Sequence, residues 1–263
     1  MATYLDRILE HHRARAQKGQ PAASLVADAA AAPPPRDFAG ALSAQGLSVI
    51  AECKRRSPSL GPIDLDLDPA SLAKEYVAGG ASALSVLTDV EFFGGSPEDL
   101  VSARAGVEAP VLRKDFTVCE SDVYEARAMG ADAVLLIVAA LDQSELSGLL
   151  SLSSELGMAA LVEVHDEVEM DVALGAGAAM VGVNQRDLFT FVVDPGRALR
   201  MAYLIPPGVV SVAESGIGSP RQAAALEAAG YDAVLVGEHL LRSDDRRAAV
   251  RALAGGSHPR AGE

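Results

Sequence analysis

Residues 48–61 read SVIAECKRRSPSLG, in which an apolar, β-prone segment leads directly into a group of polar and charged side chains. The segment predicts a buried strand that ends at Cys53. Because side chains alternate along a strand, Glu52 and Lys54 are expected to project to the same side of the sheet. An anion and a cation at one strand end are typical of a surface ion pair as well as of a functional site. The other strand ends of the chain decide between these interpretations.

The rest of the chain repeats this arrangement of a short apolar run, a polar loop and a helical segment rich in Ala, Leu and Glu. Such alternation predicts parallel strands joined by right-handed crossovers. Eight runs, spaced by about 25 residues in a chain of 263, predict a closed (β/α)₈ TIM barrel rather than an open sheet. The predicted strands are residues 48–53, 83–88, 110–114, 133–138, 160–164, 180–184, 209–213 and 233–237.

The first 47 residues are predicted to form an N-terminal helical extension that lies against the barrel. Residues 3–17 have apolar side chains at three- and four-residue spacing, which predicts a helix. The Ala- and Pro-rich sequence that follows, through residues 33–35, is predicted to be a linker because its prolines forbid a continuous helix. The barrel is expected over residues 48–254, and residues 255–263 are expected to be a disordered tail.

A doubly wound dinucleotide-binding domain is the main alternative fold, and Gly175-Ala176-Gly177 is its best candidate fingerprint. The third glycine of that fingerprint is missing, and the stretch precedes a predicted strand instead of following one. The phosphate-binding turn of such a domain joins a strand to the helix after it. The sequence therefore favours the barrel.

The composition excludes several classes of function. The net charge of −14 opposes binding to nucleic acid and to anionic membranes, because both require a positive face. The chain has no apolar run of about 18 residues, and its N-terminus lacks the apolar stretch of a signal peptide. We therefore expect a cytoplasmic protein that binds neither nucleic acid nor membrane. No long apolar stripe outside the barrel indicates an obligate interface, so a monomer is expected.

Charged side chains recur at the predicted strand ends, where the active site of a TIM barrel forms. Glu52 and Lys54 follow the first strand, Lys114 the third, Glu163 the fifth and Glu214 the seventh. An accidental ion pair would not repeat around a closed ring. The pattern favours a functional site in which two lysines and several glutamates converge on one mouth.

Two glycine-rich loops indicate where a phosphate group could bind. The sequences ESGIGSP (214–220) and VGEHLL (236–241) follow the last two predicted strands and lead into helix starts. Backbone N–H groups at such places bind phosphate, and barrels often use the loops after strands seven and eight for this purpose. The alternative is that the glycines only make tight turns. The proximity of Lys54 in a closed ring favours phosphate binding.

Several motifs, in this order and spacing, resemble the indole-3-glycerol phosphate synthase family of tryptophan biosynthesis. They are IAECKRRSPSLG, LTDVEFFGGS, PVLRKDF, LVEVH, VGVNQRDL, VAESGI and VLVGE, and they extend over residues 48–240. PVLRKDF together with ECKRRSPS is specific to that family, and GVNQRDL strengthens the resemblance. The preceding helical extension also fits.

The resemblance implies a carbon–carbon lyase that needs no cofactor and acts on a small phosphorylated substrate. The reaction implied is decarboxylating and dehydrating ring closure of 1-(2-carboxyphenylamino)-1-deoxyribulose 5-phosphate, which gives indole-3-glycerol phosphate, CO₂ and water. By similarity, Lys114 is the general acid, Glu163 serves the dehydration, and Glu52 and Asn184 orient the hydroxyls and the lysine. The division of acid and base roles among Lys54, Lys114 and Glu163 stays open. Burial lowers the pKa of a lysine, but nearby glutamates would keep Lys114 charged.

The resemblance also implies which residues bind the remaining parts of the substrate. Arg186 is expected to contact substrate or anchor a loop, with a surface ion pair to Asp187 as the alternative. Residues implied at the ring, carboxylate and hydroxyls are Ser57, Pro58, Phe93, Phe116, Arg186, Leu188 and Glu214, and those at the phosphate are Lys54, Ser215, Gly216, Gly237 and Glu238.

Three further expectations complete the sequence analysis. No metal is proposed, because His11, His12, His165 and His258 show no ligand spacing, and His239 is interpreted as structural. A related barrel, phosphoribosylanthranilate isomerase, is an alternative that works with a Cys and an Asp, but Cys53 alternates away from its charged neighbours. A non-catalytic barrel should have lost one of its two lysines or Glu163, and none is lost.

Overall fold

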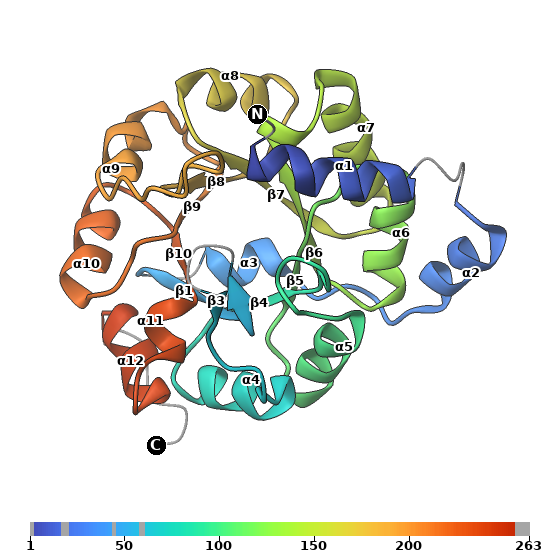
Figure 1. Ribbon diagram of the computed structural model, residues 1–263. Helices are drawn as coiled ribbons and strands as arrows, with labels where there is room; N and C mark the ends of the chain where they lie inside the picture. Colours follow the sequence, from blue (N-terminus) through green and yellow to red (C-terminus); the bar gives the residue numbers. More distant parts are fainter. Residues whose placement is uncertain (1–2, 17–20, 44–45, 58–60, 256–263) are drawn as a thin grey trace.

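The computed structural model describes residues 3–16, 21–43, 46–57 and 61–255. Eight parallel strands close into a barrel in the order β1, β10, β9, β8, β7, β6, β5 and β4 (Figure 1), which confirms the predicted fold class. The predicted disordered tail falls mostly on residues 256–263, which lie outside the described residues. The strands are β1 (Ser48–Cys53), β4 (Ala83–Leu87), β5 (Val111–Lys114), β6 (Ala133–Ile137), β7 (Ala159–Val164), β8 (Met180–Asn184), β9 (Val210–Glu214) and β10 (Ala233–Val236).

The ring closes through β1, which pairs in parallel with both β4 and β10. Ile50 lies opposite Ala83 on one side, and Ala51 lies opposite Val236 on the other. Because all eight strands run in one direction, their carboxyl ends meet at one mouth of the barrel.

The outer helices begin where the sequence supplies a capping side chain. Asp68, Ser96 and Ser219 each accept a hydrogen bond from a backbone N–H of the helix that follows, and a proline comes directly after each of them. The helices of the ring are α4 (Pro69–Ala78), α5 (Pro97–Gly106), α6 (Glu120–Ala128), α7 (Gln143–Glu155), α8 (Glu167–Gly175), α9 (Arg197–Met201), α10 (Pro220–Ala228), α11 (Glu238–Leu241) and α12 (Arg246–Leu253). Short pieces are the hairpin β2 (Arg56–Ser57) and β3 (Gly61–Pro62), and the 3₁₀ turns η1 (Val138–Ala140) and η2 (Ala202–Leu204).

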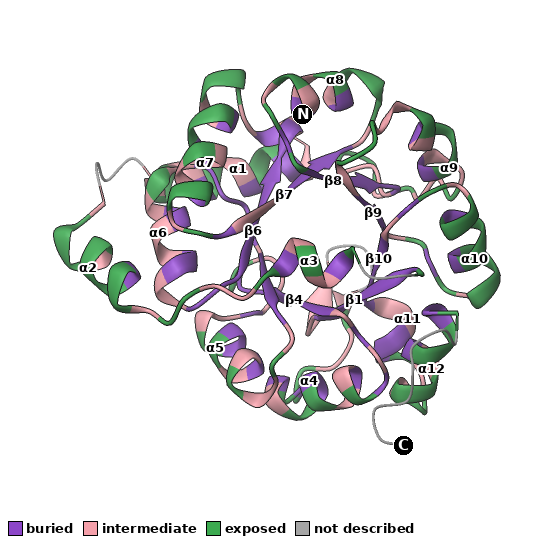
Figure 2. Ribbon diagram, turned by 180° about the vertical axis from the view of Figure 1, so that it is seen from behind, coloured by how far each residue is buried: buried purple, intermediate pink, exposed green. Residues whose placement is uncertain are grey.

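Apolar side chains form two cores, one between the strands and the helix ring and one inside the barrel. Helix α3 (Phe38–Leu42) lies at the amino ends of the strands, beside β1 and β4 at one side of the opening in Figure 2. Its Phe38 and Leu42 are buried and belong to the inner core, together with Ile50 and Ala83. Burying an aromatic or leucine side chain contributes about 1.5–3 kcal/mol, so α3 acts as a stable plug.

Helix α1 (Tyr4–Ala16) crosses the opposite end and lies in front of the barrel in Figure 1. Its Leu5 and Ile8 are buried in the inner core. The extension therefore reaches both ends of the barrel, with α1 at the carboxyl ends of the strands and α3 at the amino ends. No helix in the described part of the chain has the length and apolar character needed to cross a membrane.

The prediction of a linker between the first helix and Pro33–Pro35 is partly wrong. Helix α2 (Ala23–Ala31) forms within it and packs on the outside of α6 (Figure 1), where Ala29 is buried. Alanine is the strongest helix former, and the prolines limit only where the helix ends. Ala32 is accordingly extended and closes α2 just before the prolines.

Candidate active site

A cavity of about 510 Å³ opens at the carboxyl ends of the strands. Its size is within the range of about 300–1,000 Å³ that is usual for small-molecule sites. All the predicted site residues line it except Pro58, which lies outside the described residues. They are Glu52, Lys54, Ser57, Phe93, Lys114, Phe116, Glu163, Asn184, Arg186, Leu188, Glu214, Ser215, Gly216, Gly237 and Glu238.

Lys114, the last residue of β5, lies between two buried carboxylates. Its Nζ is 3.0 Å from Oε2 of Glu163 and 3.6 Å from Oε2 of Glu214. Burial alone would lower the pKa of Lys114, but Glu163, Glu214 and Glu52 outweigh burial and raise it above the ordinary value of 10.5. The lysine is therefore an ammonium ion at neutral pH, as the sequence predicted, and it can donate a proton to a group in the cavity.

Glu163 of β7 has partners at both carboxylate oxygens, and Lys114 is the partner of Oε2. Asn184 donates a hydrogen bond of 3.0 Å to Oε1, and Nε2 of His165 lies 3.4 Å from the same oxygen. Burial would raise the pKa of Glu163, but Lys114, His165 and Asn184 together lower it below the usual range. The side chain is only 1% exposed, so these three partners set its orientation.

The pKa of Glu214 of β9 is shifted in the opposite direction to that of Glu163, although both residues lie beside Lys114. Burial and the charge of Glu163 raise the pKa of Glu214 to about 8, against the opposing effect of the lysine. Two carboxylates that share one cation cannot both be stabilised equally as anions. The site therefore contains one firmly ionised carboxylate and one that takes up a proton near neutral pH.

Glu52 and Lys54 lie beside each other at the end of β1, with Nζ 2.5 Å from Oε1. The alternation argument from the sequence predicted this arrangement. Strand β10 is the neighbour of β1 in the ring, so Lys54 lies next to the loop that begins at Gly237. The cation of this pair faces the same cavity as Lys114.

The loops after β9 and β10 pack closely against neighbouring residues. Ser215 and Gly216 have φ angles of 64° and 72°, in the left-handed region, and a Cβ atom on Gly216 would lie 2.5 Å from Val193. A Cβ on Gly237 would lie 2.5 Å from Oε1 of Glu52. Because Ser215 is not a glycine, its conformation is maintained at a cost of roughly 1–3 kcal/mol, as is common at binding sites.

Apolar side chains also line the cavity. Phe93 and Phe116 follow β4 and β5, and their ring centroids are 6.4 Å apart at a tilt of 35°. Leu188 belongs to this apolar lining, and Leu135 and Ile137 of β6 also line the cavity. The sequence analysis missed the two β6 residues because that strand end carries no ionisable group.

Arg186 stabilises the loop that follows β8. Its Nη1 donates a hydrogen bond of 3.1 Å to the carbonyl oxygen of Phe191, and a backbone bridge joins Arg186 to Val193. Phe191 in turn contacts Tyr4 of α1, with 5.1 Å between ring centroids. These contacts agree with a loop-anchoring arginine, and the side chain of Asp187 instead accepts hydrogen bonds from its own loop.

Glu238, the first residue of α11, is paired with a cation. Its Oε1 lies 3.2 Å from Nε of Arg242, one turn later in the chain, and both residues line the cavity. The acidic side chain that the sequence placed beside a phosphate is thereby compensated. The sequence analysis did not identify Arg242, nor His239, as a cavity residue.

The comparisons with known proteins give a single answer. A model of the family "Indole-3-glycerol phosphate synthase" matches residues 5–253. The chain belongs to this family. Indole-3-glycerol phosphate synthase 2 of Streptomyces coelicolor is 56% identical over 233 residues, covering 89% of this chain and 90% of that protein. Indole-3-glycerol phosphate synthase of Mycobacterium avium is 52% identical over 262 residues, covering 98% and 96%.

A solved structure agrees on the architecture alone. Thiamine phosphate pyrophosphorylase from Pyrococcus furiosus aligns with a TM-score of 0.60 over 82% of this chain and 96% of that chain, at 16% identity. Membership of the indole-3-glycerol phosphate synthase family confirms the resemblance that the sequence motifs carried, and with it the predicted function and enzyme class.

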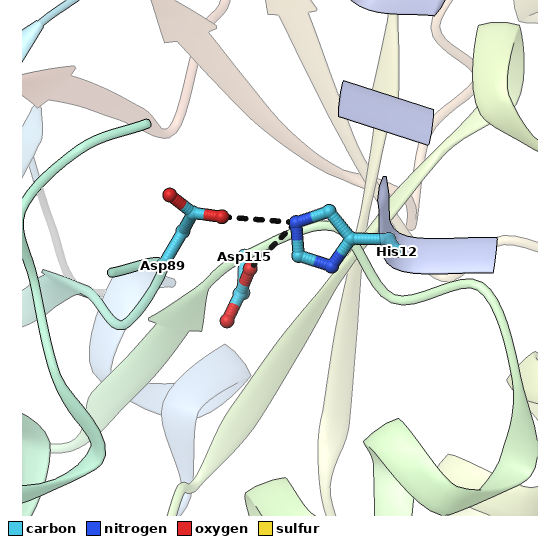
Figure 3. A group of neighbouring side chains, drawn as sticks. All are labelled: His12, Asp89 and Asp115. Carbon is cyan, nitrogen blue, oxygen red and sulfur yellow. Dashed lines mark hydrogen bonds and ion pairs between the residues drawn. The ribbon is translucent and has the colours of Figure 1, made fainter. Parts of the chain in front are cut away.

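A second polar cluster lies beside the cavity, at the roof formed by α1 (Figure 3). Nε2 of His12 is 3.0 Å from Oδ2 of Asp89 and 3.9 Å from Oδ1 of Asp115, and all three residues are buried. The three ligand atoms lie within 4.8 Å of one another, a spacing that a metal ion could span. Both aspartates, however, already accept several hydrogen bonds, from Phe92, Phe93, Phe116, Thr88 and Arg113. We interpret the cluster as a set of buried polar contacts that holds α1 against the loops after β4 and β5.

Replacing His12 with alanine is expected to lower the free energy of unfolding by about 2–4 kcal/mol, because it removes a buried ring and a hydrogen bond to a carboxylate. Urea denaturation followed by circular dichroism measures the change. His11→Ala is the matched control, since His11 directly precedes His12 in the same helix and is exposed. Equal stabilities of the two variants would contradict a stabilising role for the contacts of His12.

Neither His12 nor His165 has metal-ligand spacing in the sequence, so neither was predicted to belong to the site. His12 contacts Asp89, 77 positions away in the chain, and His165 contacts Glu169, four positions away. The second contact had a sequence signal, because His165 and Glu169 are four residues apart at the start of α8. The first had none.

Proposed function

We propose that this protein catalyses the conversion of 1-(2-carboxyphenylamino)-1-deoxyribulose 5-phosphate to indole-3-glycerol phosphate, CO₂ and water. The observation that carries the proposal is the Lys114 ammonium group, held between Glu163 and Glu214 at the base of a cavity that also contains an aromatic wall and two glycine-rich loops. The substrate has a ketone, an aromatic carboxylate and a phosphate, and the cavity offers a partner for each.

The first step forms the carbon–carbon bond between the carboxylate-bearing ring carbon and the ketone carbon. Negative charge grows on the ketone oxygen, and Lys114 donates a proton to it. The buried carboxylates beside Lys114 keep the lysine protonated before this step. The aromatic ring lies against Phe93 and Phe116, where burial of its apolar faces is favourable.

The second and third steps restore conjugation. The bond to the carboxylate breaks, CO₂ leaves, and its bonding electrons return to the ring. The new hydroxyl then leaves as water with a second donated proton, which enters from solvent, while a proton is removed from the neighbouring C–H or N–H. We assign the dehydration to Glu163, with Asn184 and Glu52 orienting the lysine and the hydroxyls. Two protons are donated and one is removed, so each turnover takes up one proton from solvent.

The phosphate is proposed to lie at the ends of β9, β10 and β1, which are neighbours in the barrel. Backbone N–H groups of Gly216, Gly237 and Glu238 would bind it, with Ser215 and Lys54 as further donors. Lys54 supplies the local positive charge that an overall net charge of −14 makes necessary.

The other parts of the substrate complete the proposed assignment. Ser57, Arg186 and Glu214 are proposed to contact its carboxylate and hydroxyl groups, and Leu188 its ring. We further propose that the barrel over residues 48–254 works as a monomer in the cytoplasm, with the extension as its roof and plug.

The direct test is the appearance of indole fluorescence when purified protein receives the carboxyphenylamino-deoxyribulose phosphate. Product is expected, with release of one CO₂ per indole formed. No product from folded protein would contradict the proposal and direct the assay to phosphoribosylanthranilate isomerisation. That isomerase works with a reactive cysteine. Cys53 is buried, and burial raises its pKa far above the usual range, so the isomerase is the poorer candidate.

A further inference from the structure

His165 lies behind Glu163, at the end of β7, and it connects the active site to α8. Its Nδ1 is 3.0 Å from Oε2 of Glu169, and the backbone N–H of His165 donates a hydrogen bond of 2.7 Å to the same oxygen. Its Nε2 is 3.4 Å from Oε1 of Glu163. One imidazole ring thus joins a carboxylate of the outer helix to a carboxylate of the catalytic cavity.

These three side chains are mostly removed from solvent. The side chain of His165 is 11% exposed, that of Glu169 is 19% exposed, and that of Glu163 is 1% exposed. Nε2 of His165 is buried and makes no hydrogen bond within the described part of the chain. A buried ring nitrogen without a partner is costly, unless it carries a proton shared with the carboxylate that it faces.

The charges around the ring all favour its protonated form. Glu163 faces it from β7 and Glu169 from α8. Burial would lower the pKa of His165, but these two carboxylates outweigh burial and raise it to about 10. η1, which also packs against β7 and α8, is VAA in sequence and carries no charge. Beyond Glu163 lie Lys114 and Glu214, and the charge of His165 acts on Glu214 as well.

We propose that His165, oriented by Glu169, is a positioning residue that holds Glu163 as an ionised carboxylate directed at Lys114. The four side chains form a line of alternating charge, from Glu169 at the rim through His165 and Glu163 to the Lys114 ammonium group. His165 acts only through Glu163, and the inference rests on the proposed function because it assigns Glu163 to the reaction.

The proposal explains how Lys114 returns to its acid form after each turnover. Ring closure leaves the lysine as a neutral amine, and one proton must enter from solvent. A carboxylate at 3.0 Å favours the ammonium form. If Glu163 retained the proton that it removes in the dehydration, the lysine would remain neutral and the next ring closure would lack its acid. His165 prevents this by stabilising the anionic form of Glu163.

The test compares kcat and KM against pH for the wild type, His165→Asn and His165→Gln. Without the imidazolium, the pKa of Glu163 rises, so Glu163 becomes protonated at a higher pH than in the wild type. We expect the acid limb of the kcat profile of His165→Asn to lie about one pH unit or more above that of the wild type, the effect of one pKa unit, and kcat to recover as pH rises. KM should change less than about twofold, because only the form of Glu163 changes.

The second variant and a matched control separate positioning from a general defect. The amide of His165→Gln can still donate to Glu163, so part of the loss should be recovered. Glu169→Gln should shift the profile in the same direction by less, whereas Glu167→Gln, an exposed acid in the same turn of α8, should leave it unchanged. A uniform loss at every pH, or a profile of His165→Asn that superimposes on that of the wild type, would overturn the proposal.

An NMR titration tests the proposal independently of activity. The protein contains five histidines, so His165→Asn identifies the ring signal that disappears. That ring should stay protonated throughout the neutral range in the wild type and titrate at a lower pH in Glu169→Gln. A ring that titrates near the ordinary value of about 6.5 would overturn the proposal. Absence of product from the wild type would instead contradict the proposed function. The titration would still show whether Glu163 and Glu169 keep His165 protonated.

Discussion

Lys114→Ala is expected to lower kcat by about 10²–10⁴, the usual contribution of a positioned general acid. The lysine is the group that donates to the ketone oxygen, and its Nζ lies between Oε2 of Glu163 and Oε2 of Glu214. No other ammonium group in the described residues lies between those two carboxylates, so water would have to supply the proton. Steady-state kinetics with fluorescence detection of the product measure the loss.

Two comparisons make this result specific. Lys74→Ala removes an exposed lysine of α4 and should leave kcat unchanged. Lys54→Ala should mainly raise KM, because Lys54 is assigned to the phosphate. An undiminished kcat in Lys114→Ala, together with a large loss in Lys54→Ala, would transfer the acid role to Lys54. Since removing Lys114 leaves two buried carboxylates without their cation, unfolding of each variant must be measured in parallel.

The barrel could be predicted from the sequence because each of its units carries a local signal. Strand runs such as AVLLIV are bounded by helix caps and glycine turns, and the order of the elements determines parallel pairing. Predicted strand ends differ from the observed ones by no more than one residue, as with residues 209–213 and Val210–Glu214. Helix α2 was missed because three prolines were given more weight than the alanine run before them.

The residues of the candidate site that lie at strand ends could be predicted from the sequence. A closed ring brings Glu52, Lys114 and Glu163 together whatever their separation in sequence, so their convergence followed from the topology alone. Contacts that depend on the path of the N-terminal extension could not be predicted from the topology. His12 reaches Asp89 only because α1 crosses the mouth, and no periodicity in residues 3–17 encodes that direction.

Glu163→Gln is expected to change both the rate and its pH dependence. The amide cannot accept a proton in the dehydration, so kcat should fall by about 10²–10⁴. It also removes the nearest negative charge from Lys114. In the wild type this charge helps to raise the pKa of the lysine above 10.5, and without it burial lowers the pKa. Because Lys114 acts as an ammonium ion, activity is lost above its pKa, so the alkaline limb of the profile should move to lower pH.

Asn184→Ala provides the matched comparison for this shift. Asn184 donates a hydrogen bond to Oε1 of Glu163 but carries no charge, so its removal should lower kcat while the alkaline limb stays near its wild-type position. If the limb moved equally in both variants, the shift would reflect a general disturbance of the cavity rather than the charge of Glu163. A limb that stayed in place in Glu163→Gln would show that Glu214 and Glu52 alone keep Lys114 protonated. The electrostatic role of Glu163 would then be secondary to its role as a base.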